Sequence, residues 1–158
     1  MKILYAPSSR CFSDDLHRNV ACGFDSFVLE SLVGLENAEV VYLPHSKSDK
    51  KIVESILNIF GDLVKSAKVA PKTIDVVVSD MSSLVFKYVL WTQNPGLLCL
   101  FGFHSISYPE NDKYFTLLEN CAIPVHSCKE LKESLRNYQT IKALKAPKIK
   151  EILEGVAL

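Results

Sequence analysis

The sequence predicts an α/β fold, a three-layer Rossmann-like open parallel sheet built by a single domain. Short β-branched or apolar runs alternate with segments of helical periodicity along most of the 158 residues. Two of the runs, 74–78 and 97–101, are almost entirely apolar, as expected of strands that helices cover on both faces. Parallel strands need crossover helices between them, and the alternation supplies those helices.

The first half of the chain contains two predicted strand and helix pairs. A strand at 2–5 precedes a helix over about 24–34, and a strand at 39–43 precedes a second helix. Ser48 or Asp49 caps that second helix, which has the strongest periodicity in the sequence. Its apolar stripe consists of Ile52, Val53, Ile56, Leu57, Phe60, Leu63 and Val64.

The second half continues the same alternation. The expected elements, in chain order, are a strand at 74–78, a helix over 82–92, a strand at 97–101, a short helix over 111–120 and a strand at 122–125. Ser127 and Glu130 have the spacing of a capping box, so a further helix begins there. The Lys-rich tail, 139–158, contains Pro147 and predicts a last helix in two pieces.

Composition limits the classes of function. Eighteen basic and eighteen acidic residues cancel, so nothing in the net charge favours nucleic acid or an anionic membrane as a partner. The opening MKILYAPSS lacks the features of a signal peptide, and no run approaches the roughly 18 apolar residues of a spanning helix. We therefore expect a cytoplasmic protein, attached at most peripherally to the inner face of the membrane.

The cysteines and acidic residues do not predict a metal site. The five cysteines are odd in number and form no C-x-x-C pair, which favours reduced, mostly buried thiols over disulfides or a zinc site. We expect neither a metal nor a cofactor.

The loops that follow the strands are where a ligand is expected, because open α/β sheets bind ligands at the carboxyl ends of their strands. In one of these loops Asp80, Ser82 and Ser83 precede a predicted helix. The unpaired N–H groups and the dipole of a helix start favour an anion, and the hydroxyls add donors for a phosphate. The alternative is that Asp80 or Ser82 only caps the helix and binds nothing.

Two other loops on the same edge add candidate side chains. His45 is suited to general acid or base catalysis, or to donating a hydrogen bond to a phosphate oxygen. Arg10 is suited to a bidentate phosphate contact. Both residue types are also common as exposed loop groups without a role. His104 is a weaker candidate for the cleft, and His17 and His126 are weaker still.

Three segments resemble a known family when taken in order: ILYAPSSR with FSDD, then EVVYLPHSKSD, then DVVVSDMSSLVFKYVLWTQNPGLLCLF. They are similar to the carboxyl-terminal, nucleotide-binding half of the CDP-glycerol:poly(glycerophosphate) glycerophosphotransferases. Those transferases make teichoic-acid and capsule-like polymers of the cell surface and have the GT-B architecture. The resemblance covers about residues 3–101, with a looser similarity in IPVHSCKELKESL.

The resemblance implies roles for the candidate residues. Ser82 and Ser83 would hold the diphosphate of a donor, a nucleotide-activated glycerol phosphate or sugar, with Asp80 in the same turn. His45 would lie beside that diphosphate as catalyst or phosphate donor, and Arg10 and Ser8 would line the cleft. The implied reaction is an in-line attack of an acceptor hydroxyl on the β-phosphorus of CDP-glycerol, with CMP leaving and no metal required.

The chain also departs from the family pattern. Leu43 stands where the family has an arginine before Pro-His, and Ser9 replaces an aromatic residue. The chain begins at Met1 with the strand of the nucleotide-binding half, so the acceptor half is absent from it. Two functions follow from this: a donor-binding half that works with a companion chain, or a stand-alone, non-catalytic nucleotide-binding or regulatory domain. A third alternative, a flavodoxin-like or receiver-like signalling domain, is disfavoured because no acidic cluster follows the first strand to hold Mg²⁺ beside a phosphoacceptor.

Apolar residues that a second half of the protein would cover predict self-association of this chain. Phe12, Phe103 and Tyr108 lie in loops of the candidate edge and would leave an apolar patch if no second half covered them. We therefore expect a homo-oligomer.

Overall fold

In the part of the chain that the structure describes, six parallel strands form one open sheet. The computed structural model describes residues 1–11, 16–65, 73–80, 83–101 and 120–155. The strands lie in the order β3-β2-β1-β4-β5-β6, and all their pairings are parallel. Their bounds are β1 Lys2–Tyr5, β2 Glu39–Tyr42, β3 Val64–Lys65, β4 Val76–Ser79, β5 Gly96–Cys99 and β6 Ala122–Val125. The α/β open-sheet class predicted from the sequence is confirmed.

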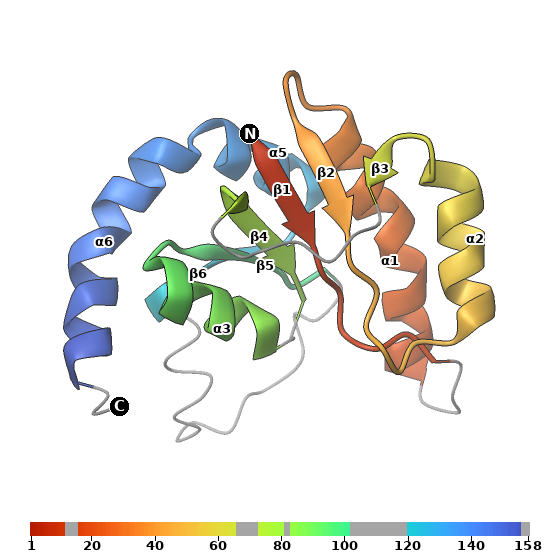
Figure 1. Ribbon diagram of the computed structural model, residues 1–158, viewed down its shortest axis with the longest axis horizontal. Coiled ribbons are helices and arrows are strands. Elements are labelled where there is room, and N and C mark those ends of the chain that lie inside the picture. Colours follow the sequence, from red (N-terminus) through yellow and green to blue (C-terminus); the bar gives the residue numbers. More distant parts are fainter. Residues whose placement is uncertain (12–15, 66–72, 81–82, 102–119, 156–158) are drawn as a thin grey trace.

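Helices cover both faces of the sheet, so the architecture has three layers (Figure 1). The helices are α1 Leu16–Val33, α2 Lys50–Phe60, α3 Ser83–Thr92, α5 Cys128–Arg136 and α6 Tyr138–Gly155. On one face, α1, α2 and α5 bury Leu29, Ile56 and Leu131 in a common apolar cluster with the sheet. On the other face, α3 and α6 bury Val85 and Ile149.

The strands supply both clusters because neighbouring side chains of a strand point to opposite faces. In β1, Ile3 and Tyr5 belong to the α1 face, whereas Leu4 belongs to the α3 face. All four residues of β4 and of β5 are buried, which explains why these runs are apolar with little alternation.

The chain changes direction across the sheet between β1 and β4. β1 pairs with β2 on one side and with β4 on the other. The helix after β1 covers one face and the helix after β4 covers the opposite face. The loops that leave these two strands therefore diverge at the carboxyl edge, and in doubly wound sheets this divergence is the usual place for a ligand.

Several element boundaries differ from those predicted. Helix α1 begins at Leu16 and continues past Gly23, so this glycine does not delay the helix start. Val64, expected in the second helix, pairs with Val40 as part of β3, because α2 ends at Phe60. The predicted helix over 111–120 lies outside the described residues except at its last residue.

Helix α6 is continuous through Pro147, whereas two pieces were predicted. Tyr138 and Ile149, one before and one after the proline, are both buried against the rest of the protein. Since proline removes one backbone donor and Pro147 lies on the exposed side, this packing is sufficient to keep one helix.

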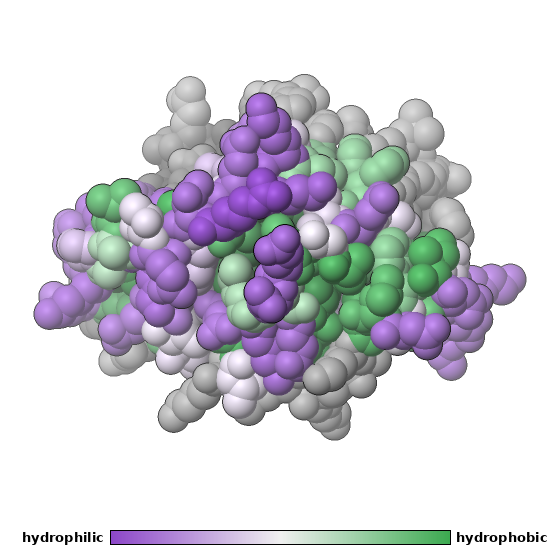
Figure 2. All heavy atoms as spheres, turned by 90° about the horizontal axis from the view of Figure 1, so that it is seen from above, coloured by the Kyte–Doolittle hydropathy of each residue, from purple (hydrophilic) through white to green (hydrophobic). Residues whose placement is uncertain are grey.

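The view from above shows a mostly polar surface with apolar side chains gathered toward the α1 and α2 side (Figure 2). Phe27 of α1, Ile59 of α2 and Leu63 after α2 are exposed by 57%, 62% and 62%. In the part of the chain that the structure describes, no helix is both long enough and apolar enough to cross a membrane.

Candidate functional site

Three of the predicted site residues meet at the carboxyl edge between β1 and β4. The carboxylate of Asp80, one residue beyond β4, accepts hydrogen bonds from the backbone N–H of Ser8 at 2.7 Å and from its hydroxyl at 2.8 Å. The same carboxylate accepts one from Nη1 of Arg10 at 2.7 Å. Nη1 of Arg10 also lies 2.9 Å from the Ser8 hydroxyl oxygen. Asp80 therefore holds the loop after β1 against the end of β4.

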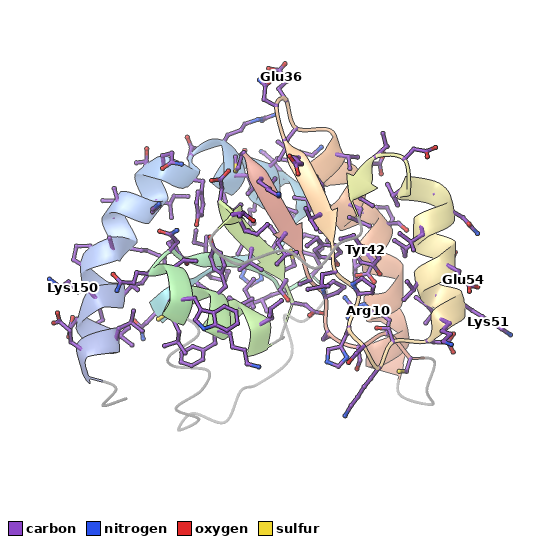
Figure 3. All side chains as sticks on the ribbon, viewed as in Figure 1. Arg10, Glu36, Tyr42, Lys51, Glu54 and Lys150 are labelled. Carbon is purple, nitrogen blue, oxygen red and sulfur yellow. The ribbon has the colours of Figure 1, made fainter. Side chains whose placement is uncertain are left out.

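Arg10 is held from the other side by Asp25 of α1. Its Nε donates to Oδ2 of Asp25 and its Nη2 donates to Oδ1, both at 2.8 Å. The hydroxyl of Tyr5 also donates to Asp25. Arg10 is 3% exposed and Asp25 is 0% exposed, so the pair is shielded from water. Figure 3 shows Arg10 near the carboxyl ends of β1 and β2, on the side of α1.

This cluster, defined as Arg10 with Asp25 and Asp80, contains one cation and two carboxylates. Burial alone would lower the pKa of Arg10, but the hydrogen bonds that its guanidinium donates to Asp25 and the charges of both aspartates raise this pKa well above its ordinary value. Burial, reinforced by the charge of Asp25, raises the pKa of Tyr5. The guanidinium thus remains charged and the phenol remains neutral at physiological pH.

The backbone of the first loop also joins the loop after β2. The N–H of Arg10 donates to the hydroxyl oxygen of Ser48 at 3.0 Å, and the N–H of Asp49 donates to the carbonyl of Arg10 at 2.7 Å. Asp49 is the N-cap of α2, and its side chain accepts from the N–H of Lys51. Arg10 consequently connects the loops after β1, β2 and β4 through its backbone and its side chain.

His45 is exposed on the loop after β2 and is not part of the buried cluster. Its Nδ1 accepts a hydrogen bond from the backbone N–H of Lys47 at 3.1 Å. In the neutral ring this contact places the proton on Nε2. His45 can therefore present an N–H donor at the edge of the sheet, as binding of a phosphate oxygen requires.

The predicted phosphate-binding serines are not placed by the structure. Ser82 lies outside the described residues. Ser83 is the first residue of α3, and its side chain is not described. Helix α3 begins at Ser83, within one residue of the predicted start at 82, and the roles of both serines stay predictions.

The remaining histidines do not add to the described site. His104 and the side chain of His17 lie outside the described parts of the chain. The backbone N–H of His126 donates to the carboxylate of Glu130 at 2.8 Å, which is part of the start of α5. His126 thus belongs to a helix cap.

Asp25 is the site residue that sequence reasoning missed. It occupies a position in the apolar stripe of α1 with Val28, Leu29 and Leu32, all of which are buried. An acid inside such a stripe is a signal for a buried partner, because an unpaired carboxylate is costly there. The signal does not identify the partner as Arg10, which is fifteen residues earlier in the chain.

The four described cysteine thiols, those of Cys11, Cys99, Cys121 and Cys128, are free. Burial raises the pKa of Cys99, and the nearby Asp80 adds to that effect, so its thiol stays protonated. Within the described ranges, no group of three or more His, Cys, Asp or Glu side chains could hold a metal ion.

Comparison with models of known protein families gave no match, and a search of curated proteins also gave none. The family resemblance of the sequence thus rests on the segments quoted above, and the function that it implies is a proposal.

Proposed function

We propose that this protein binds a nucleoside-diphosphate-activated donor of the CDP-glycerol type at the carboxyl edge of its sheet. The observation that carries the proposal is the change of direction between β1 and β4, with Ser8, Arg10 and Asp80 in the loops that diverge there. In this proposal the diphosphate lies at the start of α3, on backbone N–H groups and the hydroxyls of Ser82 and Ser83.

His45 and Arg10 have different roles in this proposal. His45 is exposed and, with Nδ1 occupied, offers Nε2–H to a phosphate oxygen. Arg10 already donates to two carboxylates, so a bidentate phosphate contact through its side chain would require an ion pair to open. We therefore assign Arg10 to positioning the loop that carries Ser8.

In the enzyme form of the proposal, the chain is the donor-binding half of a glycerophosphotransferase of cell-surface polymer synthesis, such as that of teichoic acid. A companion chain brings the acceptor hydroxyl, which attacks the β-phosphorus in line while CMP leaves. The N–H groups of the helix start and His45 stabilise the negative charge on the transferred group. Co-purification of a companion chain that restores transfer would support this form.

The second candidate function is a stand-alone, non-catalytic nucleotide-binding or regulatory domain. One observation favours it: the buried cluster carries one positive and two negative groups, so its summed charge is −1. A catalytic phosphoryl-transfer site is expected to surround the transferred group with available positive charge. If this second function is correct, the protein binds the nucleotide, but no glycerol phosphate is transferred when an acceptor and a fraction that contains the companion chain are added.

The test is a calorimetric titration of the protein with CDP-glycerol, CDP and UDP. We expect binding that prefers cytidine and that is lost in the variant Ser82→Ala with Ser83→Ala. Ser55→Ala is the matched control, because Ser55 is an exposed serine on α2 away from the candidate edge. Absence of binding by all three nucleotides would refute the proposal and leave the serines as helix caps.

Self-association is a separate proposal. The residues that predicted it, Phe12, Phe103 and Tyr108, lie outside the described residues. The exposed Phe27 and Ile59 on the α1 and α2 side give it independent support. Sedimentation velocity tests it: a concentration-dependent shift toward a dimer is expected, and a monomer at the highest concentration would reject it.

A further inference from the structure

In the described sheet, β6 is the longer of the two edge strands. It has four residues and pairs only with β5. The opposite edge, β3, has two residues, and so short an edge offers few backbone groups to a partner. An unpaired strand edge presents N–H and C=O groups that can bind a strand of another chain. The backbone groups that β6 turns outward therefore decide whether the sheet can be extended.

The direction of these groups follows from the pairing of β6 with β5. The carbonyl of Val125 accepts from the N–H of Leu100 at 2.9 Å, so it points toward β5. The C=O and N–H of one trans peptide unit point in opposite directions, and these directions alternate along a strand. The backbone groups of residues 122 and 124 and the N–H of residue 126 consequently point away from β5, toward the open edge.

Beyond Ala122, the next two outward donor positions of the edge are both unavailable. Residue 124 is a proline, which has no N–H, and its side chain is exposed whereas the rest of β6 is buried. The N–H of His126 donates to the carboxylate of Glu130 at 2.8 Å. A strand placed beside this part of β6 would find no N–H at either position to pair with its carbonyls.

The outward carbonyl of Ala122 is also occupied. Nζ of Lys145 in α6 donates a hydrogen bond to this carbonyl at 2.8 Å. Figure 1 shows α6 at the β6 end of the sheet. Because the donor is an ammonium, the hydrogen bond is charge-assisted and stronger than one from the N–H of an added strand. The side chain of Lys145 therefore takes the place of a strand donor.

Lys145 is also an exception in the pattern of its helix. The residues of α6 that turn toward the rest of the protein recur at helical spacing: Tyr138, Ile141, Lys145, Ile149 and Ile152. Tyr138 and Ile149 are buried, and the other three are half-buried. Lys145 is the charged member of this stripe, where an apolar side chain would avoid the cost of partly burying a charge. The contact with Ala122 is a role that an apolar side chain cannot fill.

We propose that Pro124, Glu130 and Lys145 close the β6 edge against the addition of a strand from a second copy of this chain. Each removes a different group from the open edge: Pro124 lacks the donor, Glu130 occupies an N–H, and Lys145 occupies a carbonyl. Between the last two groups only the carbonyl of Pro124 is left, and one hydrogen bond does not offset the entropy of ordering a strand. Copies of this chain that associate therefore leave the β6 edge unpaired.

The test opens the edge in the double variant Pro124→Val with Lys145→Met. Valine restores the N–H and favours a strand, and methionine keeps an unbranched side chain in the stripe of α6 but donates no hydrogen bond. In sedimentation velocity, we expect this variant to associate at a concentration at least about tenfold below that at which the wild type associates. Hydrogen exchange should slow in residues 122–126 of the associated protein, because a paired N–H is protected.

The matched control is Pro147→Val with Lys148→Met, which makes the same two changes at exposed positions of α6. This control should associate as the wild type does. The proposal is overturned if the edge variant associates no more than the control. It is also overturned if the edge variant associates without slower exchange in residues 122–126, because another surface is then responsible.

Pro124→Val alone tests the same edge if the double variant does not fold. The side chain of Pro124 is exposed, so its replacement leaves the core intact. This variant restores one donor and should show the slower exchange in residues 122–126 at a higher protein concentration than the double variant needs. Exchange and association like those of the wild type at the highest concentration would show that the missing N–H does not protect the edge, and the proposal would fail.

Discussion

The guanidinium of Arg10 and the carboxylate of Asp25 form a two-point ion pair inside the protein, with both N···O distances at 2.8 Å. Asp25 belongs to α1, whereas Arg10 belongs to the loop after β1 and also contacts Asp80 after β4. A single side chain thus joins a helix of one layer to the ends of two central strands. Arg10 therefore contributes to the stability of the fold, whether or not the edge of the sheet binds a ligand.

Replacing Arg10 with methionine should strongly destabilise the protein. The uncharged and shorter methionine side chain would leave Asp25 and Asp80 without their cation, and Asp25 is fully buried. Removal of one partner from a buried ion pair costs about 3–5 kcal/mol. Urea denaturation followed by circular dichroism should show this loss in the free energy of unfolding at neutral pH.

The control is Lys150→Met, which removes an exposed ion pair with Glu154 at 3.8 Å. Exposed pairs contribute about 1 kcal/mol or less, so this variant should unfold close to the wild type. If Arg10→Met cost no more than Lys150→Met, the buried cluster would be unimportant for stability and the loop after β1 would be held by its backbone contacts alone.

Gly96 should not tolerate alanine. A Cβ at this first residue of β5 would lie 2.7 Å from Cγ1 of Val85 and 2.9 Å from Cγ1 of Val77. Both valines are fully buried and β-branched, so neither can rotate away easily. Overpacking of this kind costs about 1–3 kcal/mol, and thermal and urea denaturation of Gly96→Ala should show a loss in that range.

Gly155→Ala is the matched control, since no described atom lies within 4 Å of a Cβ at Gly155, the last residue of α6. That variant should be neutral or slightly more stable, by up to about 1 kcal/mol, because alanine favours the helix. Equal effects of the two substitutions would show that α3 can shift to accommodate a methyl group at β5.

The central strands could be predicted from the sequence because strands buried on both faces are apolar runs. Residues 76–79 and 96–99 are apolar runs with few polar interruptions, and all of them are buried. The two-residue strand β3 was missed because Val64 extends the apolar stripe of the preceding helix. Only its pairing with Val40 shows that Val64 belongs to a strand and not to that helix. That pairing depends on a distant part of the chain.

Part of the candidate site could also be predicted from the sequence. Loops after parallel strands must meet at one edge, so Ser8, Arg10 and Asp80 could be placed together before their contacts were known. The partner of Arg10 could not be predicted, since Asp25 reaches it only when α1 packs on the sheet. The sequence suggested a phosphate contact for Arg10, whereas the structure shows its guanidinium bonded to two carboxylates.

The start of α5 depends on Ser127, whose hydroxyl oxygen accepts from the N–H of Glu130 at 3.1 Å. Ser127→Ala should cost about 1 kcal/mol, because that N–H loses its partner. Ser127→Thr keeps an acceptor at the same position and should retain most of the stability. Chemical denaturation of the three proteins checks both expectations, and an alanine variant as stable as the wild type would mean that water replaces the cap without cost.

Tyr42 should make the protein sensitive to alkaline pH. It lies in β2, its ring stacks on that of Tyr5 at a centroid distance of 6.1 Å, and it is 1% exposed. Burial, with a further contribution from the charge of Asp25, raises the pKa of Tyr42 to about 12. In the unfolded chain a tyrosine titrates at about 10. Above that pH the unfolded state loses its proton first, so the stability is complete below pH 10 and decreases as the pH rises to about 12.

Urea denaturation at pH 9–12 of the wild type and of Tyr42→Phe measures this effect. Burial also raises the pKa of Tyr5, Tyr88 and Tyr138, so both proteins should lose stability in this range. The wild type should lose more, by up to about 3 kcal/mol, because phenylalanine keeps the ring but cannot ionise. If the two stability curves stay parallel from pH 9 to 12, the phenol of Tyr42 titrates alike in the folded and unfolded states, and the end of β2 is open to water.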